Sequence, residues 1–165
     1  MSKPKIPKPD FLTQEQWDAV LANRSVEALR KASKADTENY LATQGKGGGA
    51  FTDLGGSTLL ITTTGRKSGN AVTTPLNYIE DGDNLVVVAS YAGLPQEPNW
   101  WLNLQKSSRA TVQVRDRRRS VIARKATAEE RLRLWARLVS IFPMWGHFQK
   151  YSERGEFAVV ILSPA

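Results

Sequence analysis

Six short β-rich runs, which follow one another after Ser57, constrain this chain more than any other feature of its sequence. Three of the connections between them are tight turns: TTTGRKSG, EDGDN and a charged turn around Asp116. Strands joined by such turns must pair antiparallel, and a small sheet hides its edges by closing. The sequence therefore predicts a mainly β fold with flanking helices, built on a six-stranded antiparallel barrel. The runs are Leu59–Thr64, Ala71–Ile79, Leu85–Ser90, Thr111–Arg115, Ser120–Ala126 and Phe157–Leu162.

Helices are predicted at four places. A capping box over Thr13–Gln16 predicts a helix from Gln14 to Ala22, and a second segment with a weak apolar stripe runs from Ser25 to about Lys34. A short helix is expected over Asn99–Gln105. A second capping box starts a helix at Thr127 that ends before Pro143. The residues expected on the apolar face of this last helix are Leu132, Trp135, Leu138, Val139 and Phe142.

Length and composition limit the function. A chain of 165 residues is long enough for a core without cross-links, and it has no cysteine and one histidine. Disulfides and thiolate chemistry are excluded, and we expect no metal site. The glycine-rich QGKGGGAF segment is predicted to be a loop or hinge. No apolar run has the length of a membrane span, so we expect a soluble, cytoplasmic protein.

The formal net charge of +7 favours an acidic partner: a nucleic acid, an anionic membrane surface or an anionic small molecule. Eight basic residues lie between Lys106 and Lys125, but at a predicted hairpin tip without a groove-entering helix or interleaved aromatic residues. We therefore expect a solvated turn and no nucleic-acid partner. The N-terminal lysines leave open a weak peripheral contact with an anionic membrane, although Glu15 and Asp18 on the following helix argue against it.

Arg66 and Lys67 stand side by side in the turn between the first two predicted strands. A glycine-bounded turn can expose several backbone N–H groups in one concavity, and the two cations add charged donors, so the turn suits a phosphate or carboxylates. Hairpin turns also carry such residues simply because they face water. The GxxxxGK spacing and the following helix of a Walker loop are both missing.

A resemblance to a known family rests on segments found in a fixed order: LLITTTGRKSG from Leu59, TPL from Thr74, the EDGDN turn, VVVASYAG from Val86 and PNWWLNL from Pro98. The chain resembles the deazaflavin (F420)-dependent nitroreductase family, and the similarity continues through ATAEE and the aromatic segment Phe142–Arg154. Family members are split-barrel oxidoreductases that use reduced coenzyme F420, an 8-hydroxy-5-deazaflavin. The resemblance implies a split β-barrel, of the type that also binds FMN, as the cofactor-binding domain over residues 51–165. Residues 1–50 would supply a tail, helical segments and the glycine-rich loop.

The resemblance also implies a set of site residues. The phosphate and acidic tail of the coenzyme would meet Arg66, Lys67, Ser68 and Gly69. The ring would lie in a groove lined by Thr74, Pro75, Asn77, Val88, Ser90 and Gly93, with Asn99, Trp100 and Asn103 at one side. From the residues alone, WWLNL also fits a helix that anchors two tryptophans in the core, and Ser90 fits a strand end.

The implied chemistry is transfer of a hydride from the reduced coenzyme to a hydrophobic unsaturated acceptor: an activated alkene or enone, a quinone or a nitro compound. Family members have tyrosines over the ring where this chain has Phe142, Trp145 and Phe148, which with Tyr91 are the expected substrate-binding residues. Without those phenols, enones and quinones are favoured over nitroimidazoles. Ser90 and Tyr151 are the expected catalytic hydrogen-bond or proton donors. His147, a lone histidine in an aromatic segment, is expected to be a packed or surface residue.

Three alternatives stay open. The same barrel could hold FMN, whose phosphate also suits the Arg66–Lys67 turn, although this is less favoured. The chain could be a non-catalytic carrier of its cofactor, or a basic nucleic-acid binder. Relatives of the barrel often pair, so a homodimer is a further expectation.

Overall fold

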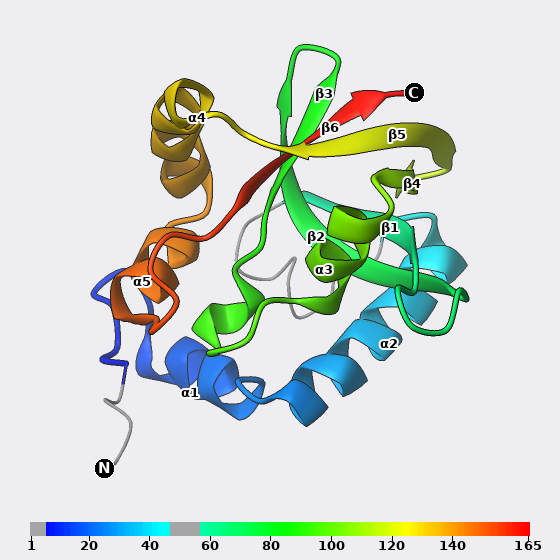
Figure 1. Cartoon of the computed structure of the whole chain (residues 1–165). Coiled ribbons are helices and arrows are strands. Elements are labelled where there is room, and N and C mark those ends of the chain that lie inside the picture. The colour runs from blue at the N-terminus through cyan, green and yellow to red at the C-terminus, as the bar shows by residue number, and fades with distance from the viewer. Residues whose placement is uncertain (1–5, 47–56) are drawn as a thin grey trace.

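The protein is described from a computed structural model that covers residues 6–46 and 57–165. Within these residues six strands close into a barrel in the order β1-β2-β3-β6-β5-β4, and all neighbouring strands are antiparallel (Figure 1). The predicted mainly β fold with flanking helices is confirmed. The strands are β1 (Ser57–Thr64), β2 (Ala71–Asp81), β3 (Asn84–Val88), β4 (Arg109–Val114), β5 (Arg117–Lys125) and β6 (Val159–Pro164).

Two of the predicted turns form hairpins whose backbones need a positive φ. Gly82 has a φ of 60° between β2 and β3, a conformation that glycine adopts without a steric penalty. Arg115 has a φ of 57° between β4 and β5, and its amide donates to the Tyr40 hydroxyl at 2.7 Å. A contact from outside the hairpin therefore supports the second turn.

Strands β3 and β6 read as continuous apolar runs because both of their faces are buried. On β3, Leu85 and Val87 point into the barrel, whereas Val86 and Val88 join a second apolar cluster outside it. Side chains from the helices complete this outer cluster, among them Trp17, Leu134 and Phe148. The described residues thus form two cores, one inside the barrel and one between the barrel and its helices.

Five α-helices flank the barrel in the described part of the chain: α1 (Gln14–Ala22), α2 (Val26–Thr43), α3 (Asn99–Lys106), α4 (Ala128–Ile141) and α5 (Met144–Tyr151). Both predicted capping boxes form, at Thr13 and at Thr127. Helix α3 adds Trp100, Trp101 and Leu104 to the barrel core. Figure 1 shows α4 and α5 together on one side of the barrel, and α1 and α2 in succession below it.

The second helix is longer than predicted: it continues nine residues beyond Lys34, to Thr43. Its distal half is held by Tyr40, which is 6% exposed and whose hydroxyl donates to the backbone carbonyl of Thr58 at 3.1 Å. A left-handed Gln44 ends the helix. The predicted end was wrong because one tertiary anchor compensates for the weak apolar stripe. The rest of the predicted glycine-rich loop, from Gly47, lies outside the described residues.

The predicted apolar face of α4 was wrong at one position. Leu132 is 81% exposed, whereas Leu134 and Leu138 are fully buried. On an α-helix, residues four apart share a face, so a face centred on Leu134 and Leu138 turns Leu132 toward solvent.

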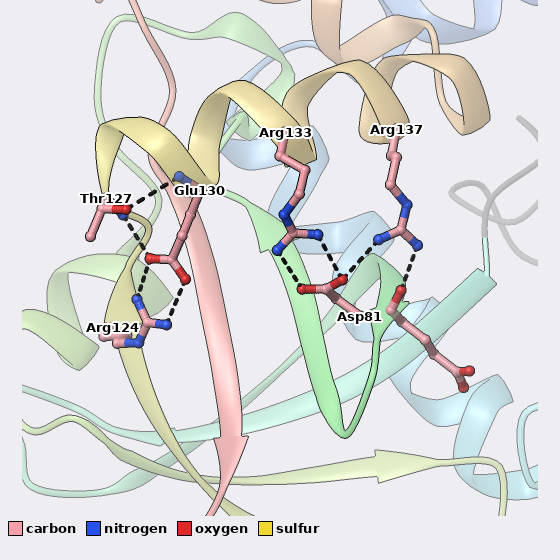
Figure 2. A network of polar contacts seen from close by, with 7 residues as sticks. Asp81, Arg124, Thr127, Glu130, Arg133 and Arg137 are labelled. Carbon is pink, nitrogen blue, oxygen red and sulfur yellow. Dashed lines mark hydrogen bonds and ion pairs between the residues drawn. The ribbon is translucent and has the colours of Figure 1, made fainter.

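Two groups of ion pairs fix α4 against the barrel (Figure 2). Asp81, at the end of β2, accepts from Arg133 at 3.0 and 2.9 Å and from Arg137 at 3.0 Å. At the start of the helix, Glu130 accepts from Arg124 of β5 at 2.6 and 2.7 Å. The Arg124 guanidinium lowers the pKa of Glu130 to about 2, with help from the Thr127 amide. These bonds add to the apolar packing of Leu134 and Leu138, which holds α4 against the barrel.

Candidate functional site

A cavity of about 690 Å³ lies between one side of the barrel and the helices α1, α2, α3 and α5. Much of its lining is apolar or aromatic, and among the described residues its only charged lining side chains are Arg30 and Lys34. The volume and the apolar character are typical of small-molecule and cofactor sites. The predicted site residues that line this cavity are Thr74, Pro75, Asn77, Val88, Ser90, Tyr91, Asn99, Trp100, Phe142, Trp145 and Phe148.

Helices α1 and α2 form a wall of this cavity that the sequence did not predict. Val20, Asn23 and Leu29 line it around the connection between the two helices, and Arg30 and Lys34 line it further along α2. The helices precede the barrel in the chain, and nothing in their local sequence indicates what they face. Their amphipathic pattern predicts a buried side but not its partner.

The Arg66 turn lies beside the cavity, linked to it through α3. Asn103 Oδ1 accepts from the Arg66 backbone amide at 3.1 Å and from its guanidinium at 3.0 Å, and Asn99 Oδ1 accepts from the guanidinium at 3.3 Å. Lys106 Nζ donates to the Arg66 carbonyl at 3.0 Å. The structure thus brings together three predicted residues, of which Asn99 lines the cavity while Asn103 is buried beneath the turn, only 3% exposed.

The backbone of this turn offers fewer free N–H groups than expected. The amides of Gly65 and Gly69 donate within the turn, the amide of Asn70 donates to the Ser68 hydroxyl, and the amide of Arg66 donates to Asn103. Within the turn, this leaves the amides of Lys67 and Ser68 without a bond to another described residue. The cradle of backbone donors that the sequence predicted is therefore reduced.

The turn after β3 brings Ser90, Tyr91 and Ala92 to the cavity. Gly93, predicted as a ring-binding residue, does not line the cavity; it is buried, and a Cβ atom there would lie 3.3 Å from Phe148. Burial raises the pKa of the Tyr91 phenol, while the nearby positive charge of Arg30 acts in the opposite direction. The phenol therefore keeps its proton at neutral pH and can donate a hydrogen bond.

Tyr151 does not line the cavity. Its ring lies 5.0 Å from that of His147 and under the Lys150 ammonium. His147 Nε2 lies 2.7 Å from the Pro7 carbonyl oxygen, and the ring packs edge-on against Trp17 and Phe11. His147 thus joins α5 to the N-terminal segment, in agreement with its expected packed or surface position.

Two arginines near the cavity were missed at the sequence level. Arg24, between α1 and α2, donates to the carbonyls of Ala92 and Gly93. Arg154, after α5, donates to the carbonyls of Ala89, Ser90 and Leu94. Their acceptors are backbone atoms 60 to 69 residues away, so no local pattern could reveal them.

In residues 6–46 and 57–165, no group of three or more histidine, cysteine, aspartate or glutamate side chains could hold a metal ion. Across the same residues, no helix combines the length and the hydropathy that crossing a bilayer requires.

Comparison with known proteins identifies the family. The sequence profile described as F420H(2)-dependent quinone reductase matches residues 32–164. A relative from Mycobacterium tuberculosis named "Putative F420H(2)-dependent quinone reductase Rv3178" is 40% identical over 107 residues, which make up 65% of this chain and 89% of the relative.

Two solved structures resemble the fold. An F420-H2 dependent reductase, FDR-A, has a TM-score of 0.57 and 30% identity and covers 63% of this chain and 92% of its own. A structure described as a domain-swapped dimer has a TM-score of 0.59 and 27% identity and covers 77% of this chain and 95% of its own. With the barrel and its cavity, these matches mean that the chain belongs to the F420H(2)-dependent quinone reductase family of oxidoreductases, whose cofactor is coenzyme F420.

Proposed function

We propose that the cavity holds the F420 ring together with a hydrophobic unsaturated acceptor, which receives the hydride. The observation that carries this proposal is the position of an aromatic cavity of about 690 Å³ directly beside a turn with two adjacent cations. An uncharged ring and an acidic tail need these two environments next to each other.

The residues present fit the cofactor. Thr74, Pro75, Asn77, Val88 and Trp100 supply a mostly apolar surface with few polar groups, which suits a flat ring. Arg66 and Lys67, with Lys106 close by, would hold the phosphate and carboxylates. Bound reduced F420 supplies a hydride, so the chain's own task is to position the acceptor and stabilise the charge that develops on it.

The acceptor would lie toward α5, against Phe142, Trp145 and Phe148, all of which line the cavity. An acceptor that gains a hydride must also gain a proton. Ser90 and Tyr91 are the hydroxyl groups that line the cavity at the turn after β3, and either can donate to a carbonyl or quinone oxygen. Tyr151 remains a prediction that its position outside the cavity lining does not favour.

Quinones and enones are the acceptor class that we favour. Phe142, at the end of α4, and Trp145 and Phe148 of α5 offer stacking but no phenol, so the polar contacts would come from other lining residues, Ser90 and Tyr91 among them. Arg30 and Lys34 also give the cavity positive charge with no carboxylate among its described lining residues. This charge would stabilise a phenolate or enolate as it forms.

The test is a fluorescence titration with oxidised F420, followed by turnover of menadione and cyclohexenone with reduced F420. The double variant Arg66→Ala/Lys67→Ala should weaken F420 binding at least about tenfold, because two charge-assisted contacts are lost. The control Arg117→Ala/Lys125→Ala removes the same charge from exposed sites on β5. Equal weakening in both variants would mean that net charge alone, rather than the turn, attracts the cofactor.

A homodimer is the protein partner that we propose, and the similarity to a domain-swapped dimer supports it. Light scattering after size exclusion would distinguish the monomer mass of 18.3 kDa from twice that value. Weak membrane contact by the N-terminal lysines remains a prediction. Lys8 would contribute little to such a contact, because its Nζ already donates to the carbonyls of Pro9 and Leu12.

A further inference from the structure

Three consecutive residues in the turn after β3 have left-handed backbones. The φ angles of Tyr91, Ala92 and Gly93 are 46°, 52° and 69°. Glycine adopts this region freely, but for tyrosine and alanine it is unfavourable. Such a conformation persists only where the surroundings determine it, and it is common at active sites.

Here the surroundings are two guanidinium groups. Arg154 donates to Leu94 O at 2.7 Å, to Ala89 O at 3.0 Å and to Ser90 O. Arg24 donates to Ala92 O at 3.0 Å and to Gly93 O at 3.3 Å. The remaining carbonyl of the turn, that of Tyr91, accepts from the Leu94 amide at 3.0 Å. All six carbonyls from Ala89 to Leu94 are therefore hydrogen-bonded.

The two arginines are partly removed from water without a carboxylate in salt-bridge contact among the described residues. Burial lowers the pKa of both, and only for Arg154 does the charge of Glu97 counteract this effect. A guanidinium keeps its proton in proteins, so the backbone carbonyls compensate for its lost hydration. Arginines used only for surface stability would be expected to stay more exposed or to pair with acids.

The turn joins both walls of the cavity. Arg24 follows Asn23, which lines the cavity at the end of α1, and Arg154 follows α5, which supplies Trp145 and Phe148. Between the two arginines, Ser90 and Tyr91 line the cavity as its candidate donors.

We infer that Arg24 and Arg154 act as positioning residues, a two-arginine clamp that holds the Ser90–Leu94 turn in its left-handed form so that Ser90 and Tyr91 face the acceptor. This role rests on the proposed function of the cavity, but the clamp itself is a property of the protein without ligand. Neither arginine lines the cavity, so each acts through the turn.

Amide hydrogen exchange, measured by NMR on the protein without ligand, tests the clamp directly. The Gly93 and Leu94 amides donate to Ser90 O and Tyr91 O, and should be protected only while the turn keeps its form. In Arg24→Gln both should exchange at least about tenfold faster, while the Gly65 amide in the β1–β2 turn keeps its rate. Arg154→Gln should likewise speed the exchange of both amides. If that variant does not fold, Arg154→Lys serves instead, because lysine keeps the charge but cannot bond to all three carbonyls at once.

A rescue variant separates a positioning role from general stability. Ala92→Gly removes the penalty for a positive φ, so Arg24→Gln/Ala92→Gly should regain much of the Gly93 and Leu94 protection that Arg24→Gln loses. The matched control is Arg131→Gln. Arg131, whose side chain is 15% exposed, also donates to a backbone carbonyl, that of Phe157, and forms an ion pair with Glu156, but it does not touch the turn. Arg131→Gln should lower the melting temperature without selective exchange at Gly93 and Leu94.

Kinetics then connect the clamp to the site. Arg24→Gln should reduce kcat/KM for menadione about 10- to 100-fold, as a misplaced donor does, while the Kd for F420 changes less than about twofold. Unchanged exchange at Gly93 and Leu94 in Arg24→Gln and in Arg154→Lys would overturn the clamp. If the wild-type protein reduces no acceptor, the proposed function fails, and the exchange result still decides whether the clamp exists.

Discussion

A single atom, Oδ1 of Asn103, accepts hydrogen bonds from both the backbone amide and the guanidinium of Arg66, at 3.1 and 3.0 Å. The amide nitrogen of the same side chain donates to Thr63 Oγ1 at 3.1 Å, and both Asn103 and Thr63 are almost fully buried. The cation of the β1–β2 turn is thus oriented by α3 from beneath, before any ligand arrives.

Asn103→Ala should therefore weaken F420 binding, by about tenfold, although Asn103 does not line the cavity. The free energy of unfolding should also fall by about 1–3 kcal/mol, because the Arg66 amide and the Thr63 hydroxyl lose their partner. Fluorescence titration and urea denaturation measure the two effects. Asn99→Ala removes one longer bond to Arg66 at an exposed residue, and should destabilise less. F420 binding by Asn103→Ala at the wild-type level would show that the orientation of Arg66 is unimportant.

The neighbouring residues Trp100 and Trp101 provide a matched pair. Both are buried in the barrel core, but Trp100 also lines the cavity whereas Trp101 does not. Both Trp→Phe variants should lower the melting temperature because each loses core contacts. Trp100→Phe alone should raise the Kd for F420 by about three- to tenfold, which corresponds to the free energy of one lost aromatic contact. Equal Kd values for the two variants would mean that the ring binds elsewhere.

Tyr40 anchors α2, and with it one wall of the cavity. Its hydroxyl donates to Thr58 O and accepts from the Arg115 amide. Tyr40→Phe should lower the free energy of unfolding by about 1–3 kcal/mol, measured in urea, because a partly buried amide and carbonyl lose their partner. Tyr78→Phe is the control, since the Tyr78 hydroxyl makes no hydrogen bond to the described residues. If the two variants are equally stable, the hydroxyl of Tyr40 does not hold the helix.

Glu130 should make the free energy of unfolding depend on pH in the acidic range. Its pKa is about 2 in the folded protein and 4.5 for an ordinary glutamate, so the ionised form stabilises the fold above about pH 4.5. The contribution is lost as pH falls from 4.5 toward 2. Melting temperatures measured across this range should show Glu130→Gln less stable than wild type at pH 6, with the difference vanishing near pH 2.

Glu129→Gln is the control for this pH dependence, because it removes the adjacent carboxylate, whereas the contacts with Arg124 and Thr127 are made by Glu130. A constant difference between Glu130→Gln and wild type at all pH values would show that the ion pair with Arg124 is not the cause.

The features that were predictable from the sequence are those that depend on neighbours in the chain. The capping boxes at Thr13 and Thr127 and the hairpin turn at Gly82 formed as predicted, because the interacting groups are within a few residues of each other. The apolar runs Leu85–Ser90 and Phe157–Leu162 predicted two of the strands, and the structure shows that the side chains on both faces of these strands are buried. The resemblance to a known family, carried by motifs in a fixed order, also predicted the cofactor F420, and the family match confirms this prediction.

The construction of the site depends on contacts between segments that are distant in the chain. The wall formed by α1 and α2, the position of Asn103 beneath Arg66, and the exposure of Leu132 depend on which faces meet after folding. The contacts of Arg24 and Arg154 with the Ser90–Leu94 turn join residues at least 60 positions apart in the chain. A backbone carbonyl is the same acceptor in every residue, so the sequence carries no mark of which one an arginine will find. That choice is made by the closure of the barrel and the packing of the helices around it.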